Sequence, residues 1–428
     1  MPDESPSTSA AECPGDAPAA LANEHGDEAL SLLQRAEAVG RGLLQRLTAL
    51  HAEVLPAGSG PKRVADHLGQ PVPMASRVLK ALSESSPLAA MYRLPGPAPL
   101  RRWVRAAGRR GADAATLKAA NDALDAFEAL IATEGGDRSA LDAQLVAWLP
   151  EARRPLELRR RQAIFRGLSE LEGASCTLDL STMILHPSAD GEHVDLCCIQ
   201  ARTGIIALRA GTGIKFVTER VMYSRPERHP LSLEGDELNA TAHGARLDAF
   251  CDGLPAELEV AHHGDRFQYI LRTPGFGPHA SADFVLAEVN RAEFSYMEPR
   301  ASQGGATFFT QLLQLPSRYG VLDVIVHRDL APTAEPELHL YRNFGEAQAC
   351  PYDPLREVDR IEPLEDVQRV RGEVADQRLA GFARYGEMLE HVRARLGWDF
   401  SDALLYRAQL EYPVPGTQLS LVFPGARF

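Results

Sequence analysis

The hydrophobic period of this sequence changes near residue 175, and the change restricts the chain to folds that combine helical and β-rich regions. Before residue 175, apolar residues recur every three or four positions across 28–55 and 114–172, which is typical of amphipathic helices. After it, short runs rich in β-branched and aromatic residues alternate with turn sequences, which predicts strands. We therefore expect an α+β multidomain chain. The predicted strands are Thr177–Leu185, Val194–Ile199, Ile205–Arg209, Lys215–Val221, Phe267–Leu271, Phe284–Val289, Val321–Val326, Leu338–Tyr341, Leu404–Glu411 and Gln418–Phe423.

Composition divides the chain further. Residues 1–26 are rich in Ser, Pro, Ala and acidic residues, which predicts a disordered N-terminal tail. Residues 113–174 are expected to form a helical connector, with dimerisation left open as a second role. Residues 175–428 are expected to form a mixed α+β domain for ligand sensing or oligomerisation. Helical patterns interrupt that domain at Gly304–Leu315 and Asp376–Leu396.

The net charge of −13 conceals a strongly basic segment. Residues 61–120 carry eleven Lys and Arg residues against three acids, a net of +8, whereas residues 1–60 have a net charge of −6. Clustered positive charge of this kind is the electrostatic signature of an anion-binding surface. Nucleic acid therefore stays among the candidate partners of this segment despite the acidity of the whole chain.

A pair of short helices joined by a glycine turn is predicted inside the basic segment. The first helix is expected over Pro61–Leu68, where Ala65 leaves room for a crossing helix. Gly69 follows at the turn, where a left-handed backbone favours glycine. The second helix is expected over Pro73–Leu82, because proline suits the first turn of a helix. This spacing is typical of a helix-turn-helix, and we place the whole motif at 61–95.

The predicted motif assigns roles to individual residues. In helix-turn-helix proteins the second helix enters the major groove of DNA, so Ser76 and Arg77 are the predicted base-reading residues. Lys62, Arg63 and Lys80 are predicted to contact phosphates and to fix the orientation of the module.

The residues that follow extend this prediction by resemblance. Met91-Tyr-Arg-Leu-Pro-Gly96 resembles the strand of a β-hairpin wing, and residues 40–100 resemble the DNA-binding domain of IclR-like bacterial regulators. The resemblance implies a winged helix-turn-helix domain over 27–112, all-α apart from the wing, with Arg93 near the phosphate backbone or minor groove. The departure from the family pattern is the Ser85-Ser-Pro-Leu88 sequence after the second helix. Three more arginines are predicted to lie along the duplex: Arg101, Arg102 and Arg105.

The sequence gives no positive signal for catalysis or for a bound cofactor or metal. His262-His263 followed by Asp265 is the most ligand-like cluster, but adjacent histidines on a strand point to opposite faces, and no third ligand has a recognisable spacing. Cys197-Cys198 lies in an apolar run, which favours buried cysteines. GxSxG, HExxH and P-loop sequences are absent. We therefore expect a protein that is not an enzyme and needs no cofactor.

The expected function is sequence-specific transcriptional regulation in a bacterial cytoplasm. Double-stranded DNA is the expected partner, and a homodimer is expected because one module reads only a short half-site. A small-molecule effector is a further expected partner, and a membrane is not, since no apolar run is long enough to span one. Two alternatives stay open: a helix pair that packs on a protein partner, and an enzyme whose site is hidden in residues 175–428.

Overall fold

The computed structural model of the chain separates into two compact units, Met1–Pro155 and Leu156–Phe428. The predicted disordered tail lies outside the described residues up to residue 23, and a helix already begins at Glu24. The structure describes residues 24–56, 58–209, 211–218, 230–238, 245–253, 259–263, 266–272, 275, 277–295, 306–343, 345, 348–351 and 353–424.

The first unit is helical, as the period of its sequence predicts. Its helices alternate with short turns, and Asp113 and Asp137 cap two of them by accepting hydrogen bonds from backbone N–H groups of the first turn. The elements are α1 (Glu24–Val54), α2 (Pro61–Leu68), α3 (Val72–Leu82), α4 (Pro87–Arg93), α5 (Pro97–Gly108), α6 (Ala114–Glu134), α7 (Arg138–Leu145) and the 3-10 turn η1 (Val146–Trp148).

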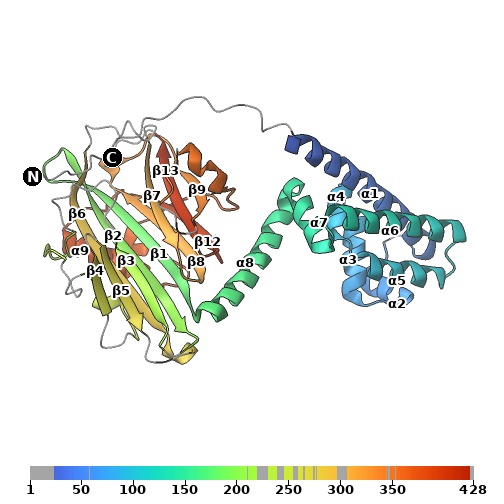
Figure 1. The fold of residues 1–428 in the computed structure, drawn as a ribbon, viewed down its shortest axis with the longest axis horizontal. Helices are drawn as coiled ribbons and strands as arrows, with labels where there is room; N and C mark the ends of the chain where they lie inside the picture. Colours follow the sequence, from blue (N-terminus) through green and yellow to red (C-terminus); the bar gives the residue numbers. More distant parts are fainter. Residues whose placement is uncertain are drawn as a thin grey trace, which may run out of the picture. The chain divides into compact units, whose positions relative to one another are not determined.

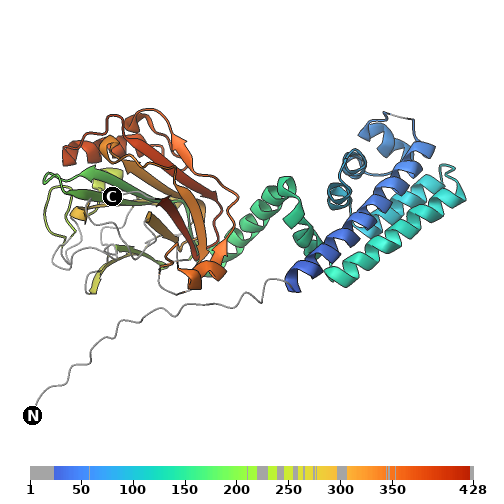
Figure 2. The same ribbon diagram turned by 90° about the horizontal axis from the view of Figure 1, so that it is seen from above.

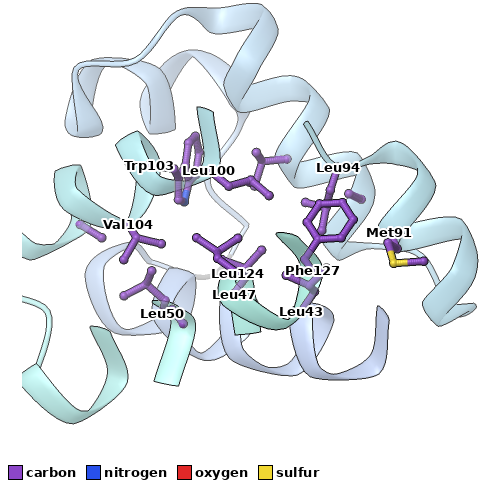
Figure 3. Close-up of a cluster of buried hydrophobic side chains, with 14 of the residues drawn as sticks. Leu43, Leu47, Leu50, Met91, Leu94, Leu100, Trp103, Val104, Leu124 and Phe127 are labelled. Atoms are coloured by element: carbon purple, nitrogen blue, oxygen red, sulfur yellow. The ribbon is translucent and has the colours of Figure 1, made fainter. Parts of the chain in front are cut away.

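One hydrophobic core joins helices α1 to α7. Leu43, Leu47 and Leu50 of α1 face Trp103 of α5 and Phe127 of α6, and all five side chains are buried (Figure 3). Helices α6 and α7 share this core with α1 to α5. The region 113–174, expected as one connector, is therefore divided, because its first two helices belong to the helical unit and the boundary between the units follows Pro155.

The wing expected at Met91–Gly96 is wrong. Met91 to Arg93 complete helix α4, and α5 begins only four residues after α4 ends. The physical reason lies just upstream, where the Ser86 hydroxyl accepts a hydrogen bond from the Ala89 N–H and Pro87 occupies the first turn. These signals start a helix through a run rich in Leu, Ala and Met, all strong helix formers.

Helix α8 (Pro150–Glu172) contains the boundary between the two units. The part of α8 from Leu156 onward belongs to the second unit, where the ring of Phe165 meets the ring of Tyr412 edge-on with centroids 5.4 Å apart. Arg161 also forms an ion pair with Glu365 at 2.7 Å. No helix within the described ranges is long and apolar enough to cross a membrane.

Within the described residues, the strands of the second unit form three sheets (Figure 1). The six-stranded sheet has the order β11-β12-β8-β1-β2-β6, in which only β1 and β8 are parallel neighbours. The four-stranded sheet has the order β10-β9-β13-β7, and the three-stranded sheet has the order β3-β5-β4. The strands are β1 (Ala174–Pro187), β2 (His193–Ala207), β3 (Gly213–Thr218), β4 (Glu259–His263), β5 (Arg266–Arg272), β6 (Ala282–Ser295), β7 (Ala306–Leu313), β8 (Ser317–Val326), β9 (Glu337–Arg342), β10 (Arg360–Ile361), β11 (Gln368–Val370), β12 (Leu404–Glu411) and β13 (Thr417–Pro424).

The six-stranded sheet is buried on both faces. One face packs on the four-stranded sheet, with Leu322 and Val324 against Leu419 and Leu421 (Figure 2). The opposite face packs on helix α9 (Tyr385–Leu396), which contributes Tyr385, Met388, Leu389 and Val392 to a second core. This double burial explains the near-continuous apolar runs of β1, β2 and β8.

Two helical predictions in this unit need correction. The pattern at Gly304–Leu315 is a strand, β7, along which burial alternates from Thr307 to Leu313 with the period of two that pairing with β13 requires. The pattern at Asp376–Leu396 is helical only from Tyr385 onward, since Gly381 adopts a positive φ of 88° in the preceding turns.

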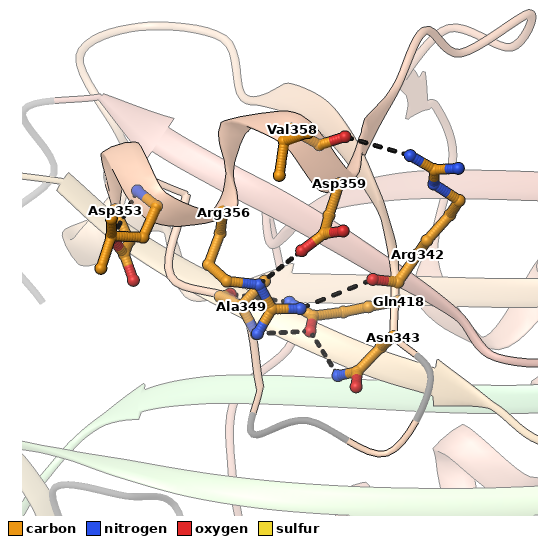
Figure 4. A network of polar contacts seen from close by, with 9 residues as sticks. Arg342, Asn343, Ala349, Asp353, Arg356, Val358, Asp359 and Gln418 are labelled. Atoms are coloured by element: carbon orange, nitrogen blue, oxygen red, sulfur yellow. Dashed lines mark hydrogen bonds and ion pairs between the residues drawn. The ribbon is translucent and has the colours of Figure 1, made fainter.

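Polar contacts fix a loop beside the outer side of the four-stranded sheet (Figure 4). The Gln418 side chain of β13 accepts a hydrogen bond from the Ala349 N–H and donates one to its carbonyl, each at 2.8 Å. Arg342 of β9 donates to the Val358 carbonyl in the 3-10 turn η6 (Pro354–Asp359) at 3.1 Å. These bonds hold the loop by its backbone, so its position depends on the strands beneath it.

Candidate nucleic-acid interface

Helices α2 and α3 have the packing that the sequence predicts for a helix-turn-helix. The turn between them contains Gly69 at φ 61° and ψ 43°, a left-handed conformation that strains any residue with a side chain. The N–H of Gly69 donates to the Ala65 carbonyl and closes the end of α2. Both helices turn small or branched apolar side chains inward: Val64, Ala65 and Leu68 on α2, and Ala75, Val78 and Ala81 on α3.

Arg77, predicted to read bases, is held by the end of helix α4. Its Nε donates to the Arg93 carbonyl at 2.6 Å, and its Nη2 donates to the Leu94 carbonyl at 3.3 Å. Arg138 of α7 donates in the same way to the Met91 and Tyr92 carbonyls, at 2.9 and 3.1 Å. The last carbonyls of a helix lack intrahelical partners and carry partial negative charge, so two arginines supply the donors that α4 lacks.

Two further predicted DNA contacts lie in ion pairs within the helical unit. Arg93 lies 2.5 Å from Glu84. Arg101 lies 2.6 Å from Glu128 and 2.7 Å from Asp125, and hydrogen bonds to these two carboxylates raise the pKa of the guanidinium. A DNA phosphate would have to compete with these carboxylates for each side chain, which weakens the assignment of both residues to an interface.

Other cations of the basic segment are exposed and form no ion pair with any residue that the structure describes. Lys62 and Arg63 lie in the first turn of α2, and Lys80 lies in the last turn of α3. On α5 the exposed arginines recur at intervals of three and four residues, which places them on one face of the helix. They are Arg102 and Arg105 within α5 and Arg109 at its C-cap.

The structure therefore separates the predicted site residues into those that are available at the surface and those that already contact other parts of the helical unit. Lys62, Arg63, Ser76 and Lys80 lie on the helix pair, with Ser76 half-buried and the three cations exposed. Arg102 and Arg105 lie on α5, and Arg77, Arg93 and Arg101 contact other parts of the helical unit. Sequence reasoning missed Val72, which begins α3 and is 45% exposed. Its position between two prolines, ahead of the amphipathic pattern, was the available signal.

Two ion pairs of the β-rich unit are buried in its core. Arg407 of β12 donates two hydrogen bonds to Asp323 of β8, at 2.8 and 2.6 Å. The Tyr385 hydroxyl of α9 donates a third to the same carboxylate at 2.6 Å. Asp323 is completely buried and Arg407 is 6% exposed. This cluster links two strands and a helix inside the core, so we interpret it as structural.

A second buried pair lies between the sheets. Arg202 of β2 donates to Asp179 of β1 at 3.2 Å, and Gln311 of β7 donates to the other oxygen of that carboxylate at 3.0 Å. The Arg202 guanidinium also lies over the ring of Phe216 at 4.4 Å. Burial raises the pKa of Asp179, while Arg202 opposes that effect. The geometry connects three strands and two sheets, so we interpret this pair as structural.

The remaining residues that the sequence singled out are two cysteines of β2 and two histidines of β4. Cys197 and Cys198 are both buried, as predicted, and burial raises the pKa of each thiol. His262 and His263 lie on β4, and Asp265 lies outside the described residues. Among the side chains that the structure describes, no three His, Cys, Asp or Glu residues are grouped so that they could hold a metal ion.

The chain was compared with known families, curated proteins and solved structures. No family model matches the sequence, and no curated protein is detectably similar to it. Among solved structures, one similar chain is described as a putative protease from Parabacteroides distasonis, at 10% sequence identity and a TM-score of 0.24. The match covers 58% of this chain and 40% of the other, so this chain spans less than half of that protein.

Proposed function

We propose that the helical unit binds double-stranded DNA through α2 and α3, and that the protein is a DNA-binding regulator. The observation that carries the proposal is the combination of Lys62, Arg63 and Lys80, exposed and without an ion pair among the described residues, on a helix pair with a left-handed glycine turn. Cations that already have carboxylate partners gain little from phosphates, whereas these three gain the whole interaction.

The proposed binding is driven by charge and oriented by the helix pair. Each lysine or arginine that reaches a phosphate releases condensed counterions, so the affinity falls as the salt concentration rises. Helix α3 then lies in the major groove, and the start of α2 contacts the backbone. The arginine row formed by Arg102 and Arg105 of α5 and Arg109 at its C-cap provides a second backbone contact. In this proposal the β-rich unit senses a ligand or pairs two copies, which places two α3 helices on successive half-sites.

The test is a fluorescence anisotropy titration of the full-length protein with a random-sequence duplex, at salt concentrations from about 50 to 200 mM. Two double variants each remove two positive charges. Lys62→Ala/Lys80→Ala removes cations that have no ion pair with a described residue, and Arg101→Ala/Lys118→Ala removes cations paired with Asp125, Glu128 and Asp122.

We expect the first double variant to lower the slope of log affinity against log salt by about 1.8, since each lost phosphate contact accounts for about 0.9. The second should leave the slope nearly unchanged, because its cations already have partners. Equal losses in both variants would mean that only net charge matters. An absence of binding at the lowest salt would contradict the proposal outright.

A further inference from the structure

The exposed side of α3 carries an unusual sequence of side chains for a DNA-reading helix. Ala75, Val78 and Ala81 face the core, which leaves Val72, Ser76 and Lys80 on a separate stripe, since residues four apart on a helix lie above one another. At 1.5 Å per residue the stripe is about 12 Å long, comparable with the width of the major groove. The stripe begins with an apolar side chain, continues with a hydroxyl and ends with an ammonium group.

The strongest hydrogen-bond donor on α3 is directed away from this stripe. Arg77 already donates to the Arg93 and Leu94 carbonyls at the end of α4. Releasing it toward a base would leave those carbonyls without these donors. The beginning of α3 also offers few donors, because Pro71 and Pro73 have no N–H group.

On this basis, and resting on the proposed DNA binding, we propose that Val72 contacts the 5-methyl group of a thymine and that Arg77 is a positioning residue. The thymine methyl is the apolar group that base pairs present in the major groove, and it is the natural contact for an exposed valine at this end of the helix. Arg77 acts through α4, because its two hydrogen bonds fix the end of α4 against α3. The preferred half-site then contains a thymine where the N-terminal end of α3 meets the groove.

The first experiment selects preferred duplexes from a random library with the full-length protein and then replaces each conserved thymine in turn by uracil. Uracil keeps the base pair and lacks only the methyl group. We expect one replacement to weaken binding about fourfold, the value for one buried carbon. Val72→Ala should bind thymine and uracil duplexes equally at that position, and Ser76→Ala should keep the difference.

The second experiment repeats the selection with Arg77→Ala and Arg77→Lys under conditions where circular dichroism shows both variants folded. A positioning role predicts an unchanged preferred sequence, uniformly weaker binding in Arg77→Ala, and partial recovery in Arg77→Lys. Loss of preference at a single guanine would identify Arg77 as a base reader and overturn the proposal. So would a selected sequence in which every thymine tolerates uracil. If the wild type binds no DNA, the proposed function fails first.

Discussion

The buried arginines of the β-rich unit and the exposed arginines of the helical unit show two different uses of a guanidinium group. In the β-rich unit, Arg407 and Arg202 are buried and held by Asp323 and Asp179 inside the core. In the helical unit, arginines lie at the surface, where some cap helix ends and others have no ion pair among the described residues. Arg77 belongs to the first kind and Arg105 to the second. A guanidinium inside a core serves the fold, whereas an exposed one without a partner remains available to a ligand.

Buried and exposed charges should also respond differently to the salt concentration. Exposed charges are screened at physiological ionic strength, because the Debye length is about 8 Å, and buried pairs are screened far less. The two buried pairs of the β-rich unit should therefore be insensitive to salt, while any phosphate contact of the helical unit should depend on it strongly. An interface and a structural pair can thus be told apart by ionic strength alone.

The largest expected effect comes from breaking the buried pair of the β-rich unit. Asp323→Asn keeps the shape of the side chain and removes the charge, which leaves the Arg407 guanidinium buried without its counter-ion. We expect a loss of about 3 to 5 kcal/mol in the free energy of unfolding of this unit. Urea unfolding, followed by hydrogen-exchange pulses read for peptides of β8, β12 and α9, measures that loss.

A matched double variant separates charge from packing in this experiment. Asp323→Leu/Arg407→Met removes both charges and fills the site with apolar side chains, so it should recover much of the stability that Asp323→Asn loses. If Asp323→Asn were as stable as the wild type, the buried pair would not stabilise the β-rich unit, and buried arginines would not differ in role from exposed ones. Peptides from α1 to α7 should be unaffected in both variants.

The helical unit should respond most to a backbone contact between α1 and α4. A Cβ atom added at Gly40 would lie 2.4 Å from the Pro87 carbonyl oxygen, which is far inside van der Waals contact. Gly40→Ala should therefore push α4 away from α1 and cost about 1 to 3 kcal/mol, the usual cost of overpacking. Urea unfolding followed through peptides of α1 and α4 measures the change.

Gly42 provides the control within the same helix. It lies two residues further along α1, and no atom lies within 4 Å of the position of an added Cβ. Gly42→Ala should stabilise the unit by about 0.5 to 1 kcal/mol, because alanine has the higher helix propensity. A loss of stability in Gly42→Ala equal to that in Gly40→Ala would mean that α1 tolerates no side chain at either position.

How far the sequence predicts this fold depends on where the determining contacts lie. Helices α2 and α3 were predicted almost to the residue, because Gly69 and the local apolar pattern determine them within 22 residues. Strand β7 was predicted as a helix, since its apolar spacing fits both periods and its strand partner β13 follows about 100 residues later. The end of helix α4, from Met91 to Arg93, was predicted as part of a strand by resemblance, against local signals from Ser86 and Pro87.

The candidate site divides in the same way. The helical period of the sequence is enough to predict that Lys62, Arg63 and Lys80 are exposed. The bonds of Arg77 to the end of α4 join residues 16 and 17 positions apart across a turn, and no periodicity reveals them. Because these bonds hold Arg77 against α4, the exposed Val72 becomes the side chain of α3 that we propose to contact a base. No pattern of charged residues indicates this role for Val72. Tertiary contacts, rather than composition, decide which cations remain available.

The smallest expected effect is a pH dependence of stability, which comes from one histidine in each unit. Burial lowers the pKa of His51 on α1, and burial is also the largest cause that lowers the pKa of His186 on β1, whose ring stacks on Trp398 at 4.8 Å. A pKa lowered by folding means that the unfolded chain binds the proton more readily. Stability is therefore fully present above the unfolded value near 6.5 and falls as the pH drops below it.

Each histidine should impose this pH dependence on its own unit alone. His51→Gln should flatten the fall in urea midpoint between pH 8 and pH 5 for peptides of α1, and His186→Gln should do the same for peptides of β1 and β8. Exchange pulses at one fixed pH keep the readout comparable. If His51→Gln also flattened the dependence of the β-rich unit, the two units would unfold as one. The contrast between buried and exposed arginines would then be a difference between two parts of one structure that unfolds cooperatively.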